Sequence, residues 1–391
     1  MPFDVVDYKY LSQALDLATQ GLYTAKPNPV VGCLFVKNNK IIAKGWHKQA
    51  GRDHAEIVGL KNCDFEAKGA TCYVTLEPCF HYGKTPPCVD ALIKAKVARV
   101  VIISLDSNKL VSGKSIKKLL EHNIQVDILD ALDKNTQEGL NLINRAQEMN
   151  KGFIKRMNHN MPWVISKIAI SMDGKIALKN GYSKWITSEK SRIDVHHLRA
   201  QMSAIITTSK TVLQDDARLN PRINLNTDKK LDSEHWPLRV VLDKDLKTNL
   251  SNNIYNLPGK VIIFTDKQNI IKAKQDKIQS FLNKDIKVYD SLELKLLLIF
   301  LAKDYQCNTV LFEAGSILNA KLLEKRLINE LIIYKSPKIL GQDGISMFNI
   351  NNITEQQLAM DFNSSLVNNL NYFKLHGAQA IDNDVKLTYR L

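Results

Sequence analysis

The tripeptide His54-Ala55-Glu56, followed by Pro78-Cys79 and Pro87-Cys88, decides how the first part of this 391-residue chain folds and what it holds. These motifs offer one imidazole and two thiolates to a metal ion, with a carboxylate two residues from the imidazole. Zinc bound by three protein ligands keeps a fourth position for water, which is typical of catalytic zinc sites. The pattern therefore predicts hydrolytic deamination, in which zinc activates water and Glu56 transfers protons.

The spacing of the two cysteines leaves other interpretations open. Cys79 and Cys88 enclose eight residues, whereas nucleic-acid deaminases carry Pro-Cys-x-x-Cys. A structural zinc site with His81 as its fourth ligand, or a group of unrelated core residues, would also fit the pattern. Gly83 and the pair Pro86-Pro87 indicate a shaped loop, and this favours the catalytic interpretation.

Length and composition indicate a globular protein of two domains. A chain of 391 residues exceeds one ordinary domain, and its hydrophobic (45%) and charged (24%) fractions are ordinary. No run of about 18 apolar residues occurs and the first residues do not begin a secretory signal, so we expect no membrane partner. The 6 cysteines fit a reducing compartment better than a disulfide framework. We therefore expect a cytoplasmic protein.

The net charge of +14 is a candidate signal for nucleic-acid binding, because Lys and Arg attract phosphates. The excess is mostly lysine spread along the chain. Arginine is more concentrated, since Arg192, Arg199, Arg218 and Arg222 lie close together in sequence. Guanidinium groups bind phosphate in two-pronged geometry, so this cluster is a candidate anion site. Exposed helix faces with ordinary ion pairs are the alternative.

The first part of the chain alternates between helical and strand periodicity. His54 and Glu56 fall in the first turn of an expected helix, and Cys79 lies just beyond the end of an expected strand. Proline before Cys88 suits the start of another helix. We expect helices near 11–22, from 54 and over 89–95, and strands over 33–36, 41–43, 71–76, 97–104 and 124–129, with a turn at Asn38-Asn39. This is an α/β sandwich.

A polar, irregular stretch over 147–161 is taken as the connection between domains, so the domains are expected at 1–147 and 148–391. A second α/β domain follows, with strands over 164–169, 204–207, 238–242, 261–264, 310–312 and 331–334, tail strands near 372 and 386, and helices over 188–200, 292–303 and 318–323. The Rossmann fingerprint Gly-x-Gly-x-x-Gly is absent. Ala314-Gly315-Ser316 before a helix can hold a diphosphate on backbone amides, or is only a tight turn.

Further motifs carry a resemblance to a known family. The runs Pro27-Asn28-Pro29-Val30-Val31-Gly32-Cys33 and Thr75-Leu76-Glu77-Pro78-Cys79 join the zinc motif, and the later half adds five more. The chain resembles the bifunctional deaminase-reductases of riboflavin biosynthesis over nearly its whole length, with the motifs in the family's order. The later motifs are Ser171-Met172-Asp173-Gly174-Lys175, Trp185-Ile186-Thr187, Thr211-Val212-Leu213-Gln214-Asp215-Asp216, Arg239-Val240-Val241-Leu242-Asp243 and Pro337-Lys338-Ile339-Leu340-Gly341.

The resemblance implies a cytidine-deaminase-like three-layer sandwich followed by a dihydrofolate-reductase-like α/β domain. It implies zinc-dependent deamination of 2,5-diamino-6-(5-phosphoribosylamino)pyrimidin-4-one, then NADPH-dependent reduction of the ribosyl group of the product to ribityl. The expected cofactors are Zn²⁺ and NADPH, and the expected partners are phosphoribosylated pyrimidines. Nucleic acid and membrane are not expected as partners, and a homo-oligomer is compatible with the resemblance.

The resemblance also implies roles by position. His54, Cys79 and Cys88 resemble the zinc ligands and Glu56 the proton carrier. Asn28 and His47 are expected to contact the deaminase substrate, with His81 and Lys84 nearby. In the reductase the expected substrate residues are Ser183, Arg199, Leu219, Arg222 and Glu313. The expected cofactor residues are Ala169, Trp185, Thr211, Asp215, Gly315, Ser316, Ile317, Leu318, Asn319, Ala320 and Lys321, and Lys167 and Asp173 are candidates to orient the sugar.

Four departures from the family pattern stand out. Phe80 replaces a small Ser after the first zinc cysteine, and Ala217 replaces a proline after the Asp-Asp pair. The segment 106–109 lacks the usual prolines. Lys244 replaces a small hydroxyl residue after the Val-Leu-Asp strand, and we expect it either to pair with the extra phosphate of the cofactor or to face solvent.

Overall fold

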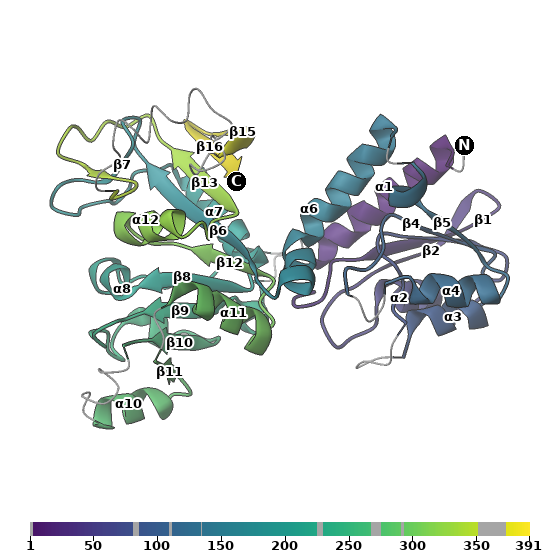
Figure 1. The fold of residues 1–391 in the computed structure, drawn as a ribbon, viewed down its shortest axis with the longest axis horizontal. Helices are drawn as coiled ribbons and strands as arrows, with labels where there is room; N and C mark the ends of the chain where they lie inside the picture. The colour runs from purple at the N-terminus through teal and green to yellow at the C-terminus, as the bar shows by residue number, and fades with distance from the viewer. Residues whose placement is uncertain are drawn as a thin grey trace. The chain divides into compact units, whose positions relative to one another are not determined.

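The computed structural model describes residues 3–80, 86–108, 112–133, 135–224, 230–266, 275–290, 293–350 and 373–391. The chain forms two compact units, Met1–Met161 and Pro162–Leu391, and each has its own sheet (Figure 1). His81, Lys84 and Lys109, which the sequence placed at or beside the deaminase site, lie outside the described residues. No helix in these ranges is both long enough and apolar enough to span a bilayer.

The first unit is built on a five-stranded sheet with the strand order β2-β1-β3-β4-β5. Both neighbours of β1 run antiparallel to it, whereas β3, β4 and β5 are parallel to one another. Asn38 and Asn39 both have positive φ (51° and 58°), as a two-residue hairpin turn requires, so the predicted turn is confirmed. The strands are β1 (Gly32–Lys37), β2 (Lys40–Trp46), β3 (Thr71–Val74), β4 (Arg99–Ile102) and β5 (Gln125–Ile128).

Helices cover both faces of this sheet and make the three layers that the sequence predicted. Helices α1 (Val5–Ala18) and α6 (Gln137–His159) pack on one face, around Leu34, Tyr73 and Val101 (Figure 1). The other face carries α2 (Ala55–Lys61), α3 (Cys88–Lys94) and α4 (Lys114–Glu121), and its core contains Phe35, Val74 and Ile102. Successive strand residues alternate between the two cores, as the period of a strand requires. The short helices η1 (Thr19–Gly21) and α5 (Leu129–Leu132) complete the unit.

Helix α6 corrects the sequence-based division of the chain. The expected boundary after Gln147 falls inside this 23-residue helix, and the two compact units divide between Met161 and Pro162 instead. The stretch over 147–161 looked irregular because α6 exposes a broad polar face. Leu142, Ala146, Asn150 and Phe153 are buried at intervals of three or four residues, which is the helical signal that the polar composition obscured.

The second unit is built on a sheet of nine described strands with the order β11-β10-β9-β8-β12-β6-β13-β16-β15 (Figure 1). Its strands are parallel from β11 to β13, and the tail hairpin of β15 and β16 adds antiparallel strands at one edge. The bounds are β6 (Trp163–Ile170), β8 (Ala204–Thr208), β9 (Leu238–Leu242), β10 (Val261–Phe264), β11 (Lys287–Tyr289), β12 (Thr309–Phe312), β13 (Glu330–Lys335), β15 (Lys374–Ile381) and β16 (Asp384–Arg390).

The parallel strands end where the site of this unit is built. In open parallel sheets, ligands bind beyond the carboxyl ends of the strands, and here Ala169, Thr208 and Glu313 stand at the ends of β6, β8 and β12. The helices are α7 (Glu189–Gln201), α8 (Ser209–Asp215), α10 (Gln275–Leu282), α11 (Leu294–Asp304) and α12 (Ser316–Glu324), with short helices η2 (Ser233–His235) and η3 (Asn253–Tyr255). Strands β7 (Lys175–Ala177) and β14 (Ile345–Ser346) form a separate pair.

Candidate functional site

The predicted metal ligands meet at the starts of two helices. His54 caps the N-terminus of α2, Cys88 is the first residue of α3, and Cys79 follows β3 along the chain. The ligand atoms of these three residues all lie within 4.8 Å of one another. The Cys88 amide donates to Cys79 Sγ at 3.1 Å, and Cys88 Sγ lies 3.4 Å from His54 Nδ1. The fold thus brings together residues that are far apart in sequence.

The chemistry of this donor set fits zinc. Zinc binds imidazole nitrogen and cysteine thiolate, and catalytic sites provide three such ligands. Hydrogen bonds from Cys88 and from His54 lower the pKa of the Cys79 thiol to about 4, which favours the thiolate. Among the described residues, no further His, Cys, Asp or Glu joins these three ligands. The three-ligand, catalytic interpretation therefore agrees with the described part of the site.

Glu56 lies in the first turn of α2, two residues after the ligand His54. Its side chain is buried, and burial together with the charge of Cys79 raises its pKa to about 7. A carboxyl group that titrates near neutrality can both accept and release a proton under working conditions. This environment suits the role of proton carrier.

Asn28, which is partly exposed, and the buried His47 form a pair beside the ligand His54. Asn28 Nδ2 lies 3.0 Å from His47 Nε2, and His47 Nδ1 lies 3.1 Å from the carbonyl oxygen of Asp53. A carbonyl oxygen accepts only, so Nδ1 carries the proton and Nε2 accepts from Asn28. The His47 ring meets the His54 ring edge to face at 5.1 Å, and burial lowers the pKa of His47. His47 is therefore a neutral side chain that orients Asn28.

Glu77 is a buried residue whose role the sequence did not reveal. One carboxylate oxygen accepts from the amides of Asp106 (3.2 Å) and Gly113 (3.1 Å), and the other accepts from Ser115 Oγ at 2.5 Å. Glu77 therefore binds Asp106, the first residue of the segment that lacks the usual prolines, together with Gly113 and Ser115 further along the chain. Of the other departures, Phe80 packs against the core of the α2–α3 face, and the Lys118 ammonium lies 5.6 Å from its ring centre.

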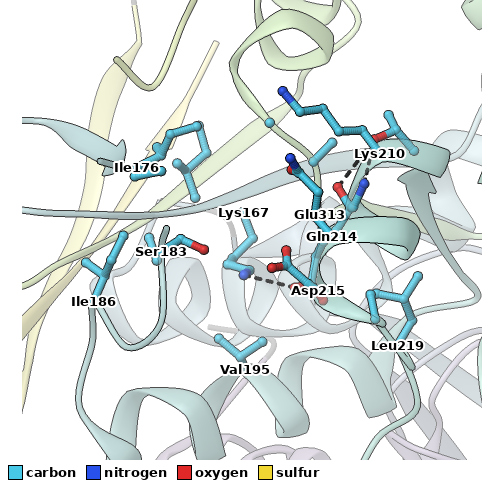
Figure 2. A pocket seen from close by; sticks show the side chains of 18 of the residues that line it. Lys167, Ile176, Ser183, Ile186, Val195, Lys210, Gln214, Asp215, Leu219 and Glu313 are labelled. Atoms are coloured by element: carbon cyan, nitrogen blue, oxygen red, sulfur yellow. Dashed lines mark hydrogen bonds and ion pairs between the residues drawn. The ribbon is translucent and has the colours of Figure 1, made fainter. Parts of the chain in front are cut away.

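The second unit contains a cavity of about 970 Å³ at the carboxyl ends of its parallel strands (Figure 2). All four members of the predicted arginine cluster line it, which confirms that they gather in space. All five predicted substrate residues also line it, and so do nine of the predicted cofactor residues. These are Ser183, Arg199, Leu219, Arg222 and Glu313, with Ala169, Trp185, Thr211, Asp215, Gly315, Ser316, Ile317, Leu318 and Lys321.

Glu313 is the centre of an ion cluster in this cavity. Glu313 Oε1 accepts from Arg199 Nε at 2.6 Å, and Oε2 accepts from Arg199 Nη2 at 3.0 Å. Lys167 Nζ lies 2.9 Å from the same Oε2. Burial opposes ionisation of Glu313, but the charges of Arg199 and Lys167 outweigh burial and hold its pKa well below the usual range. Glu313 is therefore a fixed anion. Figure 2 labels Lys167 and Glu313 among the side chains that line the cavity.

Arg222 has a neutral partner instead of a carboxylate. Its Nε donates to His196 Nε2 at 3.0 Å, and both residues line the cavity. Burial and the charges of Arg199 and Arg222 lower the pKa of His196 to about 4, so the imidazole is neutral near pH 7. The positive charge of Arg222 consequently remains available to a ligand. Sequence reasoning missed His196, because its role depends on a contact across 26 residues.

Two predicted cofactor residues, Asn319 and Ala320, are not part of the cavity lining. Both are buried inside α12, and the Asn319 side chain accepts from Ser166 Oγ (3.0 Å) and donates to the carbonyl of Ala314 (3.1 Å). Asn319 thereby binds the turn that precedes α12. Gly315 caps α12 and has no atom within 4 Å of where a Cβ would be, so open space adjoins the helix N-terminus. Together with Lys321, this end of α12 fits a cofactor diphosphate.

Four other residues were named in the sequence analysis, and the structure places two of them in the cavity lining and two outside it. Lys167 lines the cavity, but Asp173 does not. Asp173 accepts from the amides of Leu340 (3.1 Å) and Gly341 (2.7 Å), so it joins two loops. Lys244 is exposed and also outside the cavity lining, whereas Ala217 is part of it.

Comparison with known proteins matches both units to described families. Residues 162–387 match the RibD C-terminal domain. Residues 5–104 match the cytidine and deoxycytidylate deaminase zinc-binding region. The two matches fall in separate units of the structure.

The chain is also similar to relatives that cover most of its length. The riboflavin biosynthesis protein RibD of Buchnera aphidicola is 43% identical over 354 residues, which cover 88% of this chain and 91% of the relative. A structure of Acinetobacter baumannii RibD has a TM-score of 0.84 and 37% identity, with 98% of each chain covered. A diaminohydroxyphosphoribosylaminopyrimidine deaminase/5-amino-6-(5-phosphoribosylamino)uracil reductase of Thermotoga maritima has a TM-score of 0.80 and 28% identity, again over 98% of each chain.

Proposed function

This chain belongs to the RibD family, the bifunctional deaminase-reductases of riboflavin biosynthesis, and from that premise we propose how its own residues divide the two reactions. The fold is a cytidine-deaminase-like domain followed by the RibD reductase domain, and the cofactors are Zn²⁺ and NADPH. We assign the deaminase to residues 1–161 and the reductase to 162–391, which follows the division into compact units.

In the deaminase, His54, Cys79 and Cys88 hold zinc, which when bound lowers the pKa of a water molecule toward neutrality. Glu56 moves the proton to a ring nitrogen of the substrate and then to the departing ammonia. The observation that supports this role is the burial of Glu56 beside Cys79, with a pKa of about 7. The substrate is 2,5-diamino-6-(5-phosphoribosylamino)pyrimidin-4-one.

Asn28 and His47 position the pyrimidine ring. Because Asn28 Nδ2 donates to the neutral His47, the carbonyl oxygen of Asn28 is the atom that can accept from an amine on the ring. The His47 ring contacts the ring of the ligand His54, and Asn28 in turn contacts His47. This placement supports a role in recognising the amine-bearing side of the substrate.

In the reductase, NADPH supplies the hydride that converts the ribosyl group to ribityl. Trp185, Thr211, Asp215, Ala169 and the N-terminal end of α12 hold the cofactor, with Asn319 and Ala320 supporting that end from inside the helix. Ser183, Arg199, Leu219, Arg222 and Glu313 bind the substrate. Lys167, fixed by Glu313, orients the reacting sugar, and Arg222 binds the substrate phosphate. The support for the role of Arg222 is its surroundings. The carboxylate of Glu313 contacts Lys167 and Arg199, whereas the described hydrogen bond of the Arg222 side chain goes to the neutral His196.

The test follows both half-reactions in one protein. The phosphoribosylamino-pyrimidine is supplied with NADPH, and ammonia release and NADPH oxidation are recorded for the parent and for Glu56→Gln. We expect ammonia release to fall by at least about a hundredfold, because general acid-base catalysis contributes that much. Reduction of substrate that is already deaminated should continue at the parent rate. Loss of both activities, or of neither, would contradict separate sites.

We place the protein in the cytoplasm, without nucleic acid or membrane partners, and leave room for a homo-oligomer. All six cysteines are free, which supports a reducing compartment. Competition by polynucleotides in the deaminase assay tests the absence of a nucleic-acid substrate. Inhibition by a random single-stranded DNA at a concentration equal to that of the enzyme would contradict this absence.

A further inference from the structure

Helix α6 contacts the loop that carries Asn28, through one buried amide side chain. Asn150 Oδ1 accepts from the Val30 amide at 2.7 Å, and Asn150 Nδ2 donates to the Val30 carbonyl at 3.0 Å. Asn150 and Val30 are only 8% and 9% exposed. One side chain thus replaces the two backbone partners that Val30 would have in a sheet, and it does so across 120 residues of sequence.

The clamped residue lies between the two members of the proposed substrate pair. Asn28 is two residues before Val30, and its amide donates to the Ala25 carbonyl at 3.0 Å. Val31 follows directly, and its carbonyl accepts from the amide of His47 at 2.9 Å. Asn150 therefore fixes the backbone from which Asn28 projects and, one residue further, the backbone that holds His47.

A second contact from the same helix reaches the same loop. Arg156 Nη2 donates to the carbonyl of Pro27 at 3.2 Å, one residue before Asn28. The Arg156 guanidinium also lies 5.9 Å from the ring centre of Phe153, which is buried. The two contacts are six residues apart on α6 and bracket Asn28 from both sides in sequence. A helix that only packed on the sheet would need neither of them.

We propose that α6 is a positioning element of the deaminase site, in which Asn150, assisted by Arg156, sets the place of Asn28 and His47 against the pyrimidine. The proposal rests on the substrate roles of Asn28 and His47 given above. Neither α6 residue touches the zinc ligands among the contacts that the structure describes. Loss of the clamp should therefore weaken substrate binding and leave the metal and the proton carrier in place.

The test is Asn150→Leu in the full chain, which keeps the volume similar and leaves both Val30 backbone groups unpaired. We expect the KM for the deaminase substrate to rise about tenfold, the size of effect that loss of a buried hydrogen-bonded pair produces. The kcat should change by less than about threefold, on the scale of uniform binding losses. Zinc content and the rate of the reductase should match the parent. Asn158→Leu, an exposed position on the same helix, is the control and should leave all four values unchanged.

Two further variants keep the outcome decisive. If Asn150→Leu loses zinc or no longer folds, Asn150→Asp replaces it, since one carboxylate oxygen still accepts from the Val30 amide. Its KM should rise measurably above that of the parent, but by less than about tenfold. A parent-like KM in either variant, or a loss of kcat with KM unchanged, overturns the proposal. Asn28→Ala distinguishes a failure of the substrate role of Asn28 from a failure of the positioning role of α6. If it leaves KM unchanged, the assigned role of Asn28 fails, whereas a raised KM in Asn28→Ala with a parent-like Asn150→Leu rejects only the role of α6.

Discussion

Glu56 in the first unit and Glu313 in the second are both buried carboxylates, yet their surroundings give them opposite properties. Glu56 lies beside the thiolate-forming Cys79, and its pKa rises to about 7. Glu313 contacts Arg199 and Lys167, and its pKa falls well below the usual range. The comparison teaches that burial alone does not assign a role, because neighbouring charge decides between a proton carrier and a fixed anion.

The largest expected effect of a single substitution comes from removing the fixed anion. Glu313→Gln leaves the charges of Arg199 and Lys167 without their partner in a buried place, and breaking such a pair costs about 3–5 kcal/mol. We expect the reductase kcat/KM to fall at least about a hundredfold, since about 1.4 kcal/mol corresponds to tenfold. Deamination should persist at the parent rate.

Steady-state assays of both half-reactions, with thermal unfolding of the second unit, check this prediction. Glu324→Gln, an exposed carboxylate on α12, is the matched control and should behave as the parent does. A variant at Glu313 that reduces its substrate normally would remove the basis of the comparison between the two glutamates.

Removal of zinc tests the other side of the comparison. A chelator that strips the metal should abolish ammonia release, because His54, Cys79 and Cys88 would no longer present it to water. Reduction of deaminated substrate should continue, since no residue of the reductase cavity is among these ligands. Metal analysis alongside both assays gives the measurement, and a parallel loss of reduction would be evidence against separate sites.

A smaller effect is expected at the neutral partner of Arg222. His196→Leu removes the acceptor that orients the guanidinium, and we expect the KM for the phosphorylated substrate to rise about tenfold. The KM for NADPH and the deaminase rate should stay as they are. Initial-rate measurements at varied substrate decide the matter, and an unchanged substrate KM would show that His196 does not act through Arg222.

The same histidine gives a pH prediction. The folded pKa of His196, about 4, is lower than the usual 6.5, so the neutral ring stabilises the fold above pH 6.5 and this stability is lost as pH falls through 4. In His196→Gln this contribution is absent. Unfolding of the second unit measured between pH 7 and pH 4 should therefore decline less steeply in the variant, and equal slopes would contradict the shift.

The smallest effect is expected at Lys244. It is exposed and outside the cavity lining, so Lys244→Ala should change the KM for NADPH by less than about twofold, which is within the range of surface substitutions. The alternative raised by the sequence was an ion pair with the extra phosphate of the cofactor. A KM that rises tenfold in the variant would restore that alternative.

The deaminase site could be predicted because its ligands sit in short motifs at element ends. His54 and Cys88 begin helices, and Cys79 follows a strand, so a local pattern was enough to place them. Most strands of the two main sheets were also predictable, since buried strands have a local pattern of apolar residues, but the short strands β7, β11 and β14 were not predicted. For these ligands and strands, neighbouring residues in the sequence were sufficient for the prediction.

The missing parts depend on contacts between distant segments. Asn150 is one more polar residue in the sequence until its contact with Val30 is known, and the stretch over 147–161, which includes the later half of α6, was taken for a connection between domains. The gathering of four arginines was predictable from their clustering, but not that Arg199 meets a carboxylate and Arg222 a histidine. For Asn319 and Ala320 the sequence pattern predicted a cofactor contact, but both residues are buried and neither lines the cavity.

The most direct test of the central claim, that two buried glutamates run two independent sites, is a mixing experiment with Glu56→Gln and Glu313→Gln full-length chains. Given the phosphoribosylamino-pyrimidine and NADPH, Glu313→Gln alone should release ammonia without oxidising NADPH, and Glu56→Gln alone should do neither. The mixture should release ammonia and oxidise an equal amount of NADPH, because the deaminated product passes from one chain to the other. A mixture that stays unable to oxidise NADPH would contradict the account.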